Sequence, residues 1–186
     1  MADYPSVNEQ ALHLVARELA ATLNDVRLAL EAAAETPADK APIAKTAELM
    51  HGARGVLRVV EVYGAALLAE EMEQSARWLA GSDADARQYA DGLDALMRAS
   101  VQLPTYLERV LGGGRDLALV LLPLLNDLRA VRGAPLLSEG TLLSLNLSSE
   151  KAPAAPGAGA PEARLTAMQW ARRLRPRFQA GLLGLI

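Results

Sequence analysis

The chain has 186 residues, of which 51% are hydrophobic, 4% aromatic and 22% charged, with a formal net charge of -3. This length fits one ordinary domain, or one domain with a linker and part of another. The scarcity of aromatic residues argues against a β-sandwich or β-barrel. No cysteine and two histidines exclude disulfides and thiolate zinc sites and leave little room for a histidine metal site. The acidic balance argues against a protein devoted to nucleic acid.

No targeting or membrane-spanning segment is recognisable in the sequence. The N-terminal residues lack the basic and apolar regions of a secretory signal. The longest apolar run, residues 117–125, has nine residues and includes Pro123, whereas a membrane-spanning helix needs about 20. We therefore expect a cytoplasmic protein that does not insert into a membrane.

Apolar residues recur at steps of three and four through the first 133 residues, a pattern that predicts helices. Short connections between long amphipathic helices favour an antiparallel arrangement. We therefore predict an all-α antiparallel helical bundle of about five helices. The predicted helices span residues 7–35, 39–62, 65–81, 82–111 and 116–133.

Polar and helix-breaking residues suggest where these helices begin and end. Asp39 is the expected N-cap of the second helix, Ser82 or Asp83 that of the fourth, and Asp116 is expected to open the fifth. Gly64 is expected to separate the second and third helices. The fourth helix is predicted to bury Ala86, Ala90, Leu93, Met97 and Val101, and the fifth to bury Leu117, Val120, Leu121, Leu124, Leu128 and Val131.

The composition changes after residue 133. Residues 134–149 are rich in Leu and Ser without a clear period, and residues 150–163 are rich in Pro, Ala and Gly. We expect 1–149 to form the bundle with a C-terminal extension and 150–163 to be a linker. Residues 164–186 are expected to be the first helix of a following, truncated domain, and the arginines in that stretch to belong to its surface.

The second predicted helix carries the most informative polar cluster. Offsets of three, four and seven residues place Arg54, Gly55 and Arg58 on the same exposed face as His51. A glycine inside a helix costs about 1 kcal/mol relative to alanine, which is tolerated where a partner approaches the backbone. An imidazole beside guanidinium groups suits a nitrogen that attacks a phosphoryl group and then carries it.

Other interpretations of the polar residues remain open. A surface histidine is usually only solvated, and no nucleophile or orienting carboxylate is obvious beside His51, which disfavours a general base. His13 is expected to be partly exposed and inert. The carboxylates at positions 70, 71 and 73 are expected to form a solvated helix face, and Gly112–Gly114 a helix stop. No cofactor site, metal site or ATP-binding element is recognisable, so no independent catalysis is expected.

The residues H-G-A-R-G at 51–55, followed by Met72-Glu73, resemble the histidine phosphotransfer (HPt) signature, which is H-x-x-K-G followed later by an apolar residue and Glu. Two longer segments, VLRVVEVYGAALLAEEMEQ at 56–74 and residues 102–139, are similar to the N-terminal HPt-like domain of chemotaxis hybrid histidine kinases of type IV pilus systems, the PilL/ChpA type. This resemblance covers roughly residues 8–149.

The resemblance implies an HPt bundle within a CheA-like kinase that controls twitching motility. His51 would be the phospho-acceptor, which takes phosphate from the kinase catalytic core of the parent protein and passes it to an Asp of a CheY-like receiver. Arg54 would support the phosphate and Gly55 would leave space for docking, while Arg58 is added from its place on the helical wheel. Related domains without an acceptor imply the alternative, a docking or scaffold domain without phosphorylation.

Two positions depart from the HPt pattern. Arg54 stands at the usual Lys position, and Val56 stands where HPt domains usually carry a small Ser or Ala. The bulk of Val56 would either crowd the docking face or pack inward, which is where the helical wheel places it.

Overall fold

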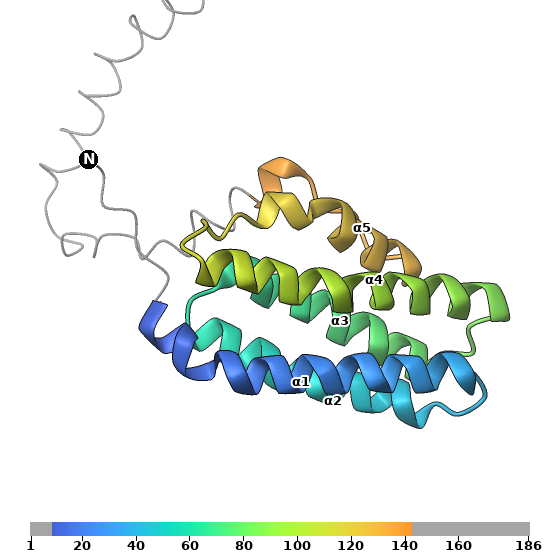
Figure 1. Cartoon of the computed structure of the whole chain (residues 1–186). Coiled ribbons are helices and arrows are strands. Elements are labelled where there is room, and N and C mark those ends of the chain that lie inside the picture. The colour runs from blue at the N-terminus through green and yellow to red at the C-terminus, as the bar shows by residue number, and fades with distance from the viewer. Residues whose placement is uncertain (1–8, 143–186) are drawn as a thin grey trace, which may run out of the picture. The chain divides into compact units, whose positions relative to one another are not determined.

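A computed structural model describes residues 9–142, and within these residues it contains helices and no strands. Consecutive long helices run antiparallel and are joined by short loops (Figure 1). The predicted all-α antiparallel bundle of about five helices is therefore confirmed. The predicted linker at 150–163 and the helix at 164–186 lie outside the described residues. The helices are α1 (Glu9–Glu35), α2 (Ala41–Val59), α3 (Tyr63–Gly81), α4 (Ala86–Leu111), the 3₁₀ turn η1 (Ala118–Leu121) and α5 (Leu122–Val131).

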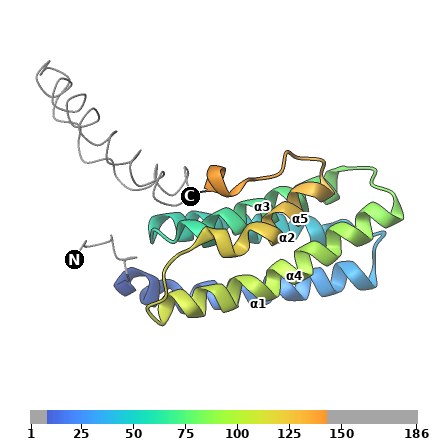
Figure 2. The same ribbon diagram turned by 90° about the horizontal axis from the view of Figure 1, so that it is seen from above.

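Four long helices form the bundle and α5 lies against one side of it. Helix α1 contacts α2 and α4, and α3 contacts the same two helices from the opposite corner. Helix α5 packs against α3 and α4 (Figure 2). Helix α3 is buried along most of its surface because it lies between α2, α4 and α5. The largest fully buried side chains include Leu30, Met50, Leu57, Leu68, Met72, Leu96 and Leu103.

The connection between α2 and α3 differs from the prediction. Helix α2 ends at Val59 rather than at 62, and α3 begins at Tyr63, so Gly64 lies inside its first turn. The break is made by Glu61, which has a φ of 62°. The two residues that flank Glu61, Val60 and Val62, are buried. The left-handed residue of the turn is therefore Glu61, between two buried valines, and not Gly64.

The boundaries of α2 and α4 also differ from the predicted caps. The N-cap of α2 is Lys40, while the side chain of Asp39 accepts a hydrogen bond of 2.9 Å from the backbone N–H of Ala41. The N-cap of α4 is Asp85, not Ser82 or Asp83. Asp85 and Gln88 form a reciprocal capping box, which satisfies two backbone N–H groups and fixes where the helix starts.

The buried face of α4 is rotated relative to the predicted stripe. Ala86, Ala90 and Val101 are exposed, and Leu93 and Met97 are half-buried at the edge of the core. The helix has apolar residues on neighbouring faces, so its periodicity alone does not select one. The core side of α4 carries Tyr89, Gly92, Ala95, Leu96, Ala99, Ser100, Leu103, Tyr106, Leu107 and Val110.

The segment before α5 does not form the predicted single helix from Asp116. Leu117 and Val120 are exposed, while Leu121 and Leu128 are buried as expected. Asp116 instead accepts hydrogen bonds from the backbone N–H of Gly64, at 3.0 and 3.1 Å, and from the hydroxyl of Tyr106, at 2.5 Å. This carboxylate therefore ties the loop after α4 to the start of α3.

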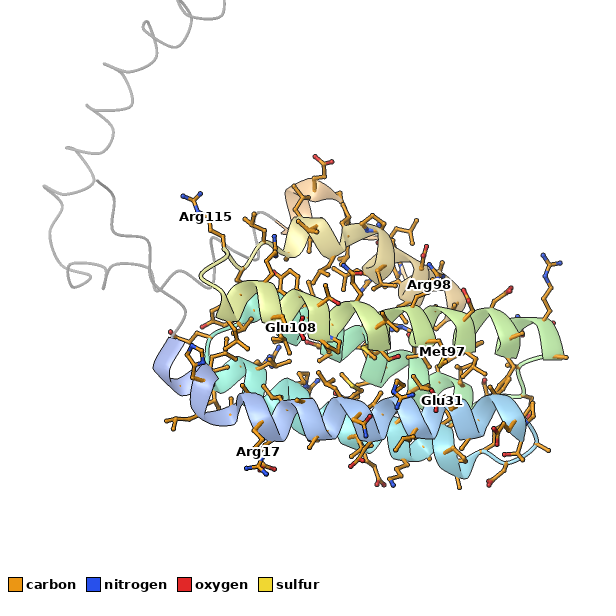
Figure 3. All side chains as sticks on the ribbon, in the orientation of Figure 1. Arg17, Glu31, Met97, Arg98, Glu108 and Arg115 are labelled. Atoms are coloured by element: carbon orange, nitrogen blue, oxygen red, sulfur yellow. The ribbon has the colours of Figure 1, made fainter. Side chains whose placement is uncertain are left out.

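Polar contacts attach α5 to the bundle. The hydroxyl of Ser75 on α3 donates a 3.0 Å hydrogen bond to the carbonyl of Leu128. Arg98 lies on the side of α4 that faces α5 (Figure 3) and pairs with Asp127 at 2.6 Å. A third connection involves a buried carboxylate of α3, Glu71, which pairs with two arginines of the α5 region, Arg129 and Arg132.

Candidate functional site

The four residues predicted to share one face of α2 do lie close together, but they are not equally exposed. His51, Gly55 and Arg58 are exposed, while Arg54 is half-buried. Arg54 lies at the seam between α2 and α3, where its guanidinium group reaches carboxylates of α3. The predicted cluster is therefore the α2 side of a polar network between two helices.

A buried carboxylate of α3 holds the ring of His51. The distance from Nδ1 of His51 to Oε1 of Glu73 is 2.9 Å. The His51 side chain is 57% exposed, whereas that of Glu73 is 1% exposed. An ionised carboxylate only accepts hydrogen bonds, so this contact requires a proton on Nδ1 and leaves the lone pair of a neutral ring on Nε2.

Glu73 also pairs with two arginines. Nη2 of Arg77, one turn later on α3, lies 2.6 Å from the same Oε1, and Nη1 of Arg54 lies 3.2 Å from Oε2. Nη2 of Arg54 is also 3.4 Å from Nδ1 of His51. With the proton on Nδ1, Nδ1 of His51 and Nη2 of Arg54 are both donors and cannot form a hydrogen bond with each other. The hydrogen bond that orients the ring is therefore the one from His51 to Glu73.

A second carboxylate extends the network toward solvent. Glu70 pairs with Arg58 at 3.2 Å and lies 3.8 Å from Arg54. These contacts join three guanidinium groups and two carboxylates in one network with the imidazole. The Arg58–Glu70 contact is also a hydrogen bond between charged groups, which fixes side-chain orientation more tightly than a neutral one does.

The structure corrects two inferences drawn from the sequence. Glu71 and Glu73 are buried, so these residues do not belong to a solvated helix face. The orienting carboxylate that was not obvious beside His51 is Glu73, which the HPt resemblance had matched by its Met72-Glu73 element. Arg77 was missed, although its position four residues after Glu73 on one helix is the usual spacing for an ion pair.

This arrangement is better suited to orienting His51 as a nucleophile than to using it as a general base. A histidine whose Nδ1 faces a carboxylate presents a nucleophilic Nε2 to solvent. No hydroxyl group forms a hydrogen bond with the ring among the described side chains. The described residues also contain no cluster of carboxylates and histidines that could hold a metal ion.

The exposed face of α2 around His51 has little side-chain bulk. A Cβ atom added at Gly52 or Gly55 would meet nothing within 4 Å. Val59 is 81% exposed, and Val56 is 37% exposed rather than packed inward as the helical wheel placed it. Together with His51, these four residues make up what we call the α2 surface.

No helix among the described residues is long and apolar enough to cross a membrane. His13, the other histidine, is exposed on α1. The Gly112–Gly114 run acts as the predicted helix stop, since α4 ends at Leu111 and Gly112 is its C-cap.

Comparison with known proteins gives one informative similarity. No protein-family model and no solved structure match the chain. The chain is 34% identical, over 178 residues, to the scaffold protein FimL of Pseudomonas aeruginosa. The alignment covers 95% of this chain and 31% of FimL, so the chain spans about a third of the length of that relative.

Proposed function

We propose that this chain is an HPt-like docking domain of the scaffold type, which acts in chemosensory signalling of a type IV pilus system through its α2 surface. The observation that carries the proposal is the identity of 34% to a scaffold protein along 95% of the chain. The pilus context rests on the resemblance of residues 8–149 to the N-terminal domain of PilL/ChpA-type kinases.

The composition of the α2 surface supports a docking role. Gly52 and Gly55 let a partner approach the helix backbone closely, and Val56 and Val59 supply exposed apolar contact area. Two glycines inside one helix cost stability, about 1 kcal/mol each relative to alanine, and neither is required by the packing of the bundle. The expected partners are the kinase catalytic core of the pathway and its CheY-like receiver domains.

The α2 surface can be tested by adding bulk to a glycine that the fold leaves open. Gly55→Leu should leave the melting temperature unchanged or raise it, because leucine is the better helix former and its side chain would extend from a position with open space around it. Binding of the receiver domain or of the kinase core, measured by isothermal titration calorimetry, should weaken at least tenfold. Gly81→Leu is the matched control, since Gly81 is also exposed with open space around it but lies at the end of α3.

One result of this binding experiment supports docking at the α2 surface and another contradicts it. Weakened binding for Gly55→Leu together with wild-type binding for Gly81→Leu supports docking at the α2 surface. Wild-type affinity of Gly55→Leu for both partners would show that the α2 surface is not where they dock.

The orientation of His51 favours a second candidate function, that of a phosphoryl carrier. In the first step the Nε2 lone pair attacks the terminal phosphorus of ATP on the kinase core, a P–N bond forms, and the P–O bond breaks with its electrons leaving on ADP. In the second step an Asp oxygen of a receiver attacks the phosphorus and the P–N electrons return to Nε2. Glu73 keeps the Nδ1 proton in place and stabilises the positive charge that the ring develops.

An assay for acid-labile phosphate distinguishes the docking function from the phosphoryl-carrier function. A phosphoryl carrier incubated with the cognate kinase core and ATP acquires acid-labile phosphate, which His51→Gln should abolish while His13→Gln should not. A wild-type chain that binds the kinase core but acquires no such label supports docking without phosphotransfer.

A further inference from the structure

We infer that Arg77 on α3 is a positioning residue for His51: together with Arg54 it offsets the charge of Glu73, so that Glu73 accepts a hydrogen bond from a neutral imidazole instead of favouring a protonated one. The biological role of Arg77 rests on the proposed phosphoryl-carrier function. Its effect on the protonation of His51 can be tested on the chain alone.

The geometry places Arg77 and His51 in competition for one atom. Nη2 of Arg77 is 2.6 Å from Oε1 of Glu73, and Nδ1 of His51 is 2.9 Å from the same oxygen. Nη1 of Arg54 lies 3.2 Å from the other oxygen as an ion pair, and that oxygen accepts no hydrogen bond from the described residues. Because guanidinium groups stay charged at all relevant pH values, the single negative charge of Glu73 is offset before the imidazole is considered.

Two guanidinium groups contact the carboxylate that holds His51. These are Arg54 from α2 and Arg77 from α3, so together with Glu73 they carry a net charge of +1. Farther from the ring, Arg58 on α2 pairs with Glu70 on α3, and Glu48, three residues before His51 on α2, is exposed. Helix α1 also packs against α2, but none of its described charged groups contacts this cluster. A proton on His51 would therefore add to an existing positive charge beside a carboxylate that is 1% exposed.

Removal of Arg77 reverses this balance. The net charge of Glu73 and the guanidinium groups in contact with it would fall from +1 to 0, and Glu73 would attract an imidazolium without that competing cation. A larger share of His51 would then be protonated near neutral pH. Protonation removes the Nε2 lone pair, which is the group that attacks an electrophile. Arg77 thus maintains the neutral, reactive form of His51, although it contacts only Glu73 and not the imidazole itself.

The reactivity of the two histidines toward diethyl pyrocarbonate measures this effect. The reagent acylates unprotonated imidazole, and mass spectrometry assigns the modification to His51 or His13. The experiment records the modification rate between pH 5.5 and 8.5 for the wild-type chain and for Arg77→Gln. Arg77 is 59% exposed, so the variant should fold, and circular dichroism checks that it does. Exposed His13 on α1 serves as an internal reference.

In Arg77→Gln the midpoint of the His51 profile should move to higher pH by about half a unit or more, which lowers the rate on the acidic side by about threefold. Arg77→Lys should restore most of the wild-type profile, and Glu73→Gln should shift the midpoint to lower pH. Arg27→Gln, which breaks an ion pair of the same spacing with Glu31 on α1, is the matched control and should change nothing at His51.

An unchanged His51 profile in Arg77→Gln, or an equal shift for His13, would overturn the inference. The result is separate from the phosphotransfer test. If the profile shifts as expected but His51 never acquires phosphate, the role of Arg77 stands and the carrier function fails.

Discussion

Gly55 and Gly64 lie in consecutive helices but in opposite surroundings. A Cβ atom at position 55 would meet nothing within 4 Å, whereas one at position 64 would lie 2.5 Å from Oδ1 of Asp116 and 2.6 Å from the hydroxyl of Tyr106. Gly55 is therefore free of packing demands, and Gly64 is required by a close approach of the chain. The same residue type thus has the proposed docking role at one position and a packing role at the other.

This difference predicts opposite effects of the same substitution. Gly55→Ala should raise the free energy of unfolding by about 0.5–1 kcal/mol, because alanine is the better helix former. Gly64→Ala should lower it by about 1–3 kcal/mol, because the methyl group displaces a hydrogen-bonded carboxylate. Urea denaturation followed by circular dichroism measures both. A destabilised Gly55→Ala would mean that this face of α2 is covered.

At the scale of the elements, one carboxylate joins three parts of the bundle. Asp116 follows α4 in the chain, yet it accepts hydrogen bonds from the backbone N–H of Gly64 at the start of α3 and from the hydroxyl of Tyr106 on α4. It therefore satisfies a backbone donor at the N-terminus of α3, where a negative charge is also favourable. Burial raises the pKa of Tyr106, and the charge of Asp116 and its hydrogen bond raise it further.

This network predicts how stability depends on alkaline pH. The Tyr106 hydroxyl has a higher pKa in the folded chain than the value of about 10 in the unfolded chain. Its contribution to stability is therefore fully present below pH 10 and is lost as the pH rises above 10, where the unfolded state releases the proton first. Unfolding free energies measured between pH 8 and 11 should fall above pH 10, and Tyr106→Phe should make this fall shallower. An unchanged slope in the variant would show that Tyr106 is not the group responsible.

At the scale of the whole described unit, α5 is held to the four-helix bundle by a buried ion-pair cluster. Glu71 on α3 is 2% exposed and pairs with Arg129 and Arg132. Arg129 also donates a 2.5 Å hydrogen bond to the carbonyl of Pro135, which fixes the segment that follows α5. In the same segment, the side-chain amide of Asn126 donates a hydrogen bond to the carbonyl of Leu137 and accepts one from the backbone N–H of Leu137.

Removal of the shared carboxylate should release α5 before the rest of the bundle. Glu71→Ala leaves two guanidinium groups without their buried partner, a change that costs about 3 kcal/mol or more. Hydrogen exchange should therefore increase in residues 118–142 and remain slow in the cores of α1 to α4. A uniform loss of protection along the chain would show instead that α5 is an integral part of one cooperative unit.

Much of the fold follows from local patterns in the sequence. The stripe of Leu12, Val15, Leu19, Leu23, Val26 and Leu30 predicted the buried face of α1; five of these six residues are buried and Val15 is half-buried at the edge of the core. The glycines at 81, 112 and 133, which the sequence marks as helix stops, lie at or within two residues of the ends of α3, α4 and α5. These features were predictable because helix formation and termination depend on residues within one or two turns.

The faces of the later helices were less predictable. Helix α4 has apolar side chains on adjacent faces, and its contacts with α1, α3 and α5 select the one that contains Leu96 and Leu103. An ideal helical wheel places Val56 inward, but Val56 is 37% exposed whereas the adjacent Leu57 is fully buried.

The sequence by itself determined that the chain is helical, approximately where each helix runs, and that His51, Arg54, Gly55 and Arg58 share one side of α2. Only the tertiary structure decided what lies opposite them. Glu73 contacts His51 from another helix, 22 residues along the chain, and Arg77 acts on His51 only through Glu73. Asp116 binds Gly64 across 52 residues. Short-range periodicity carries information about one helix at a time, whereas the partner across an interface depends on how two helices pack and at which register.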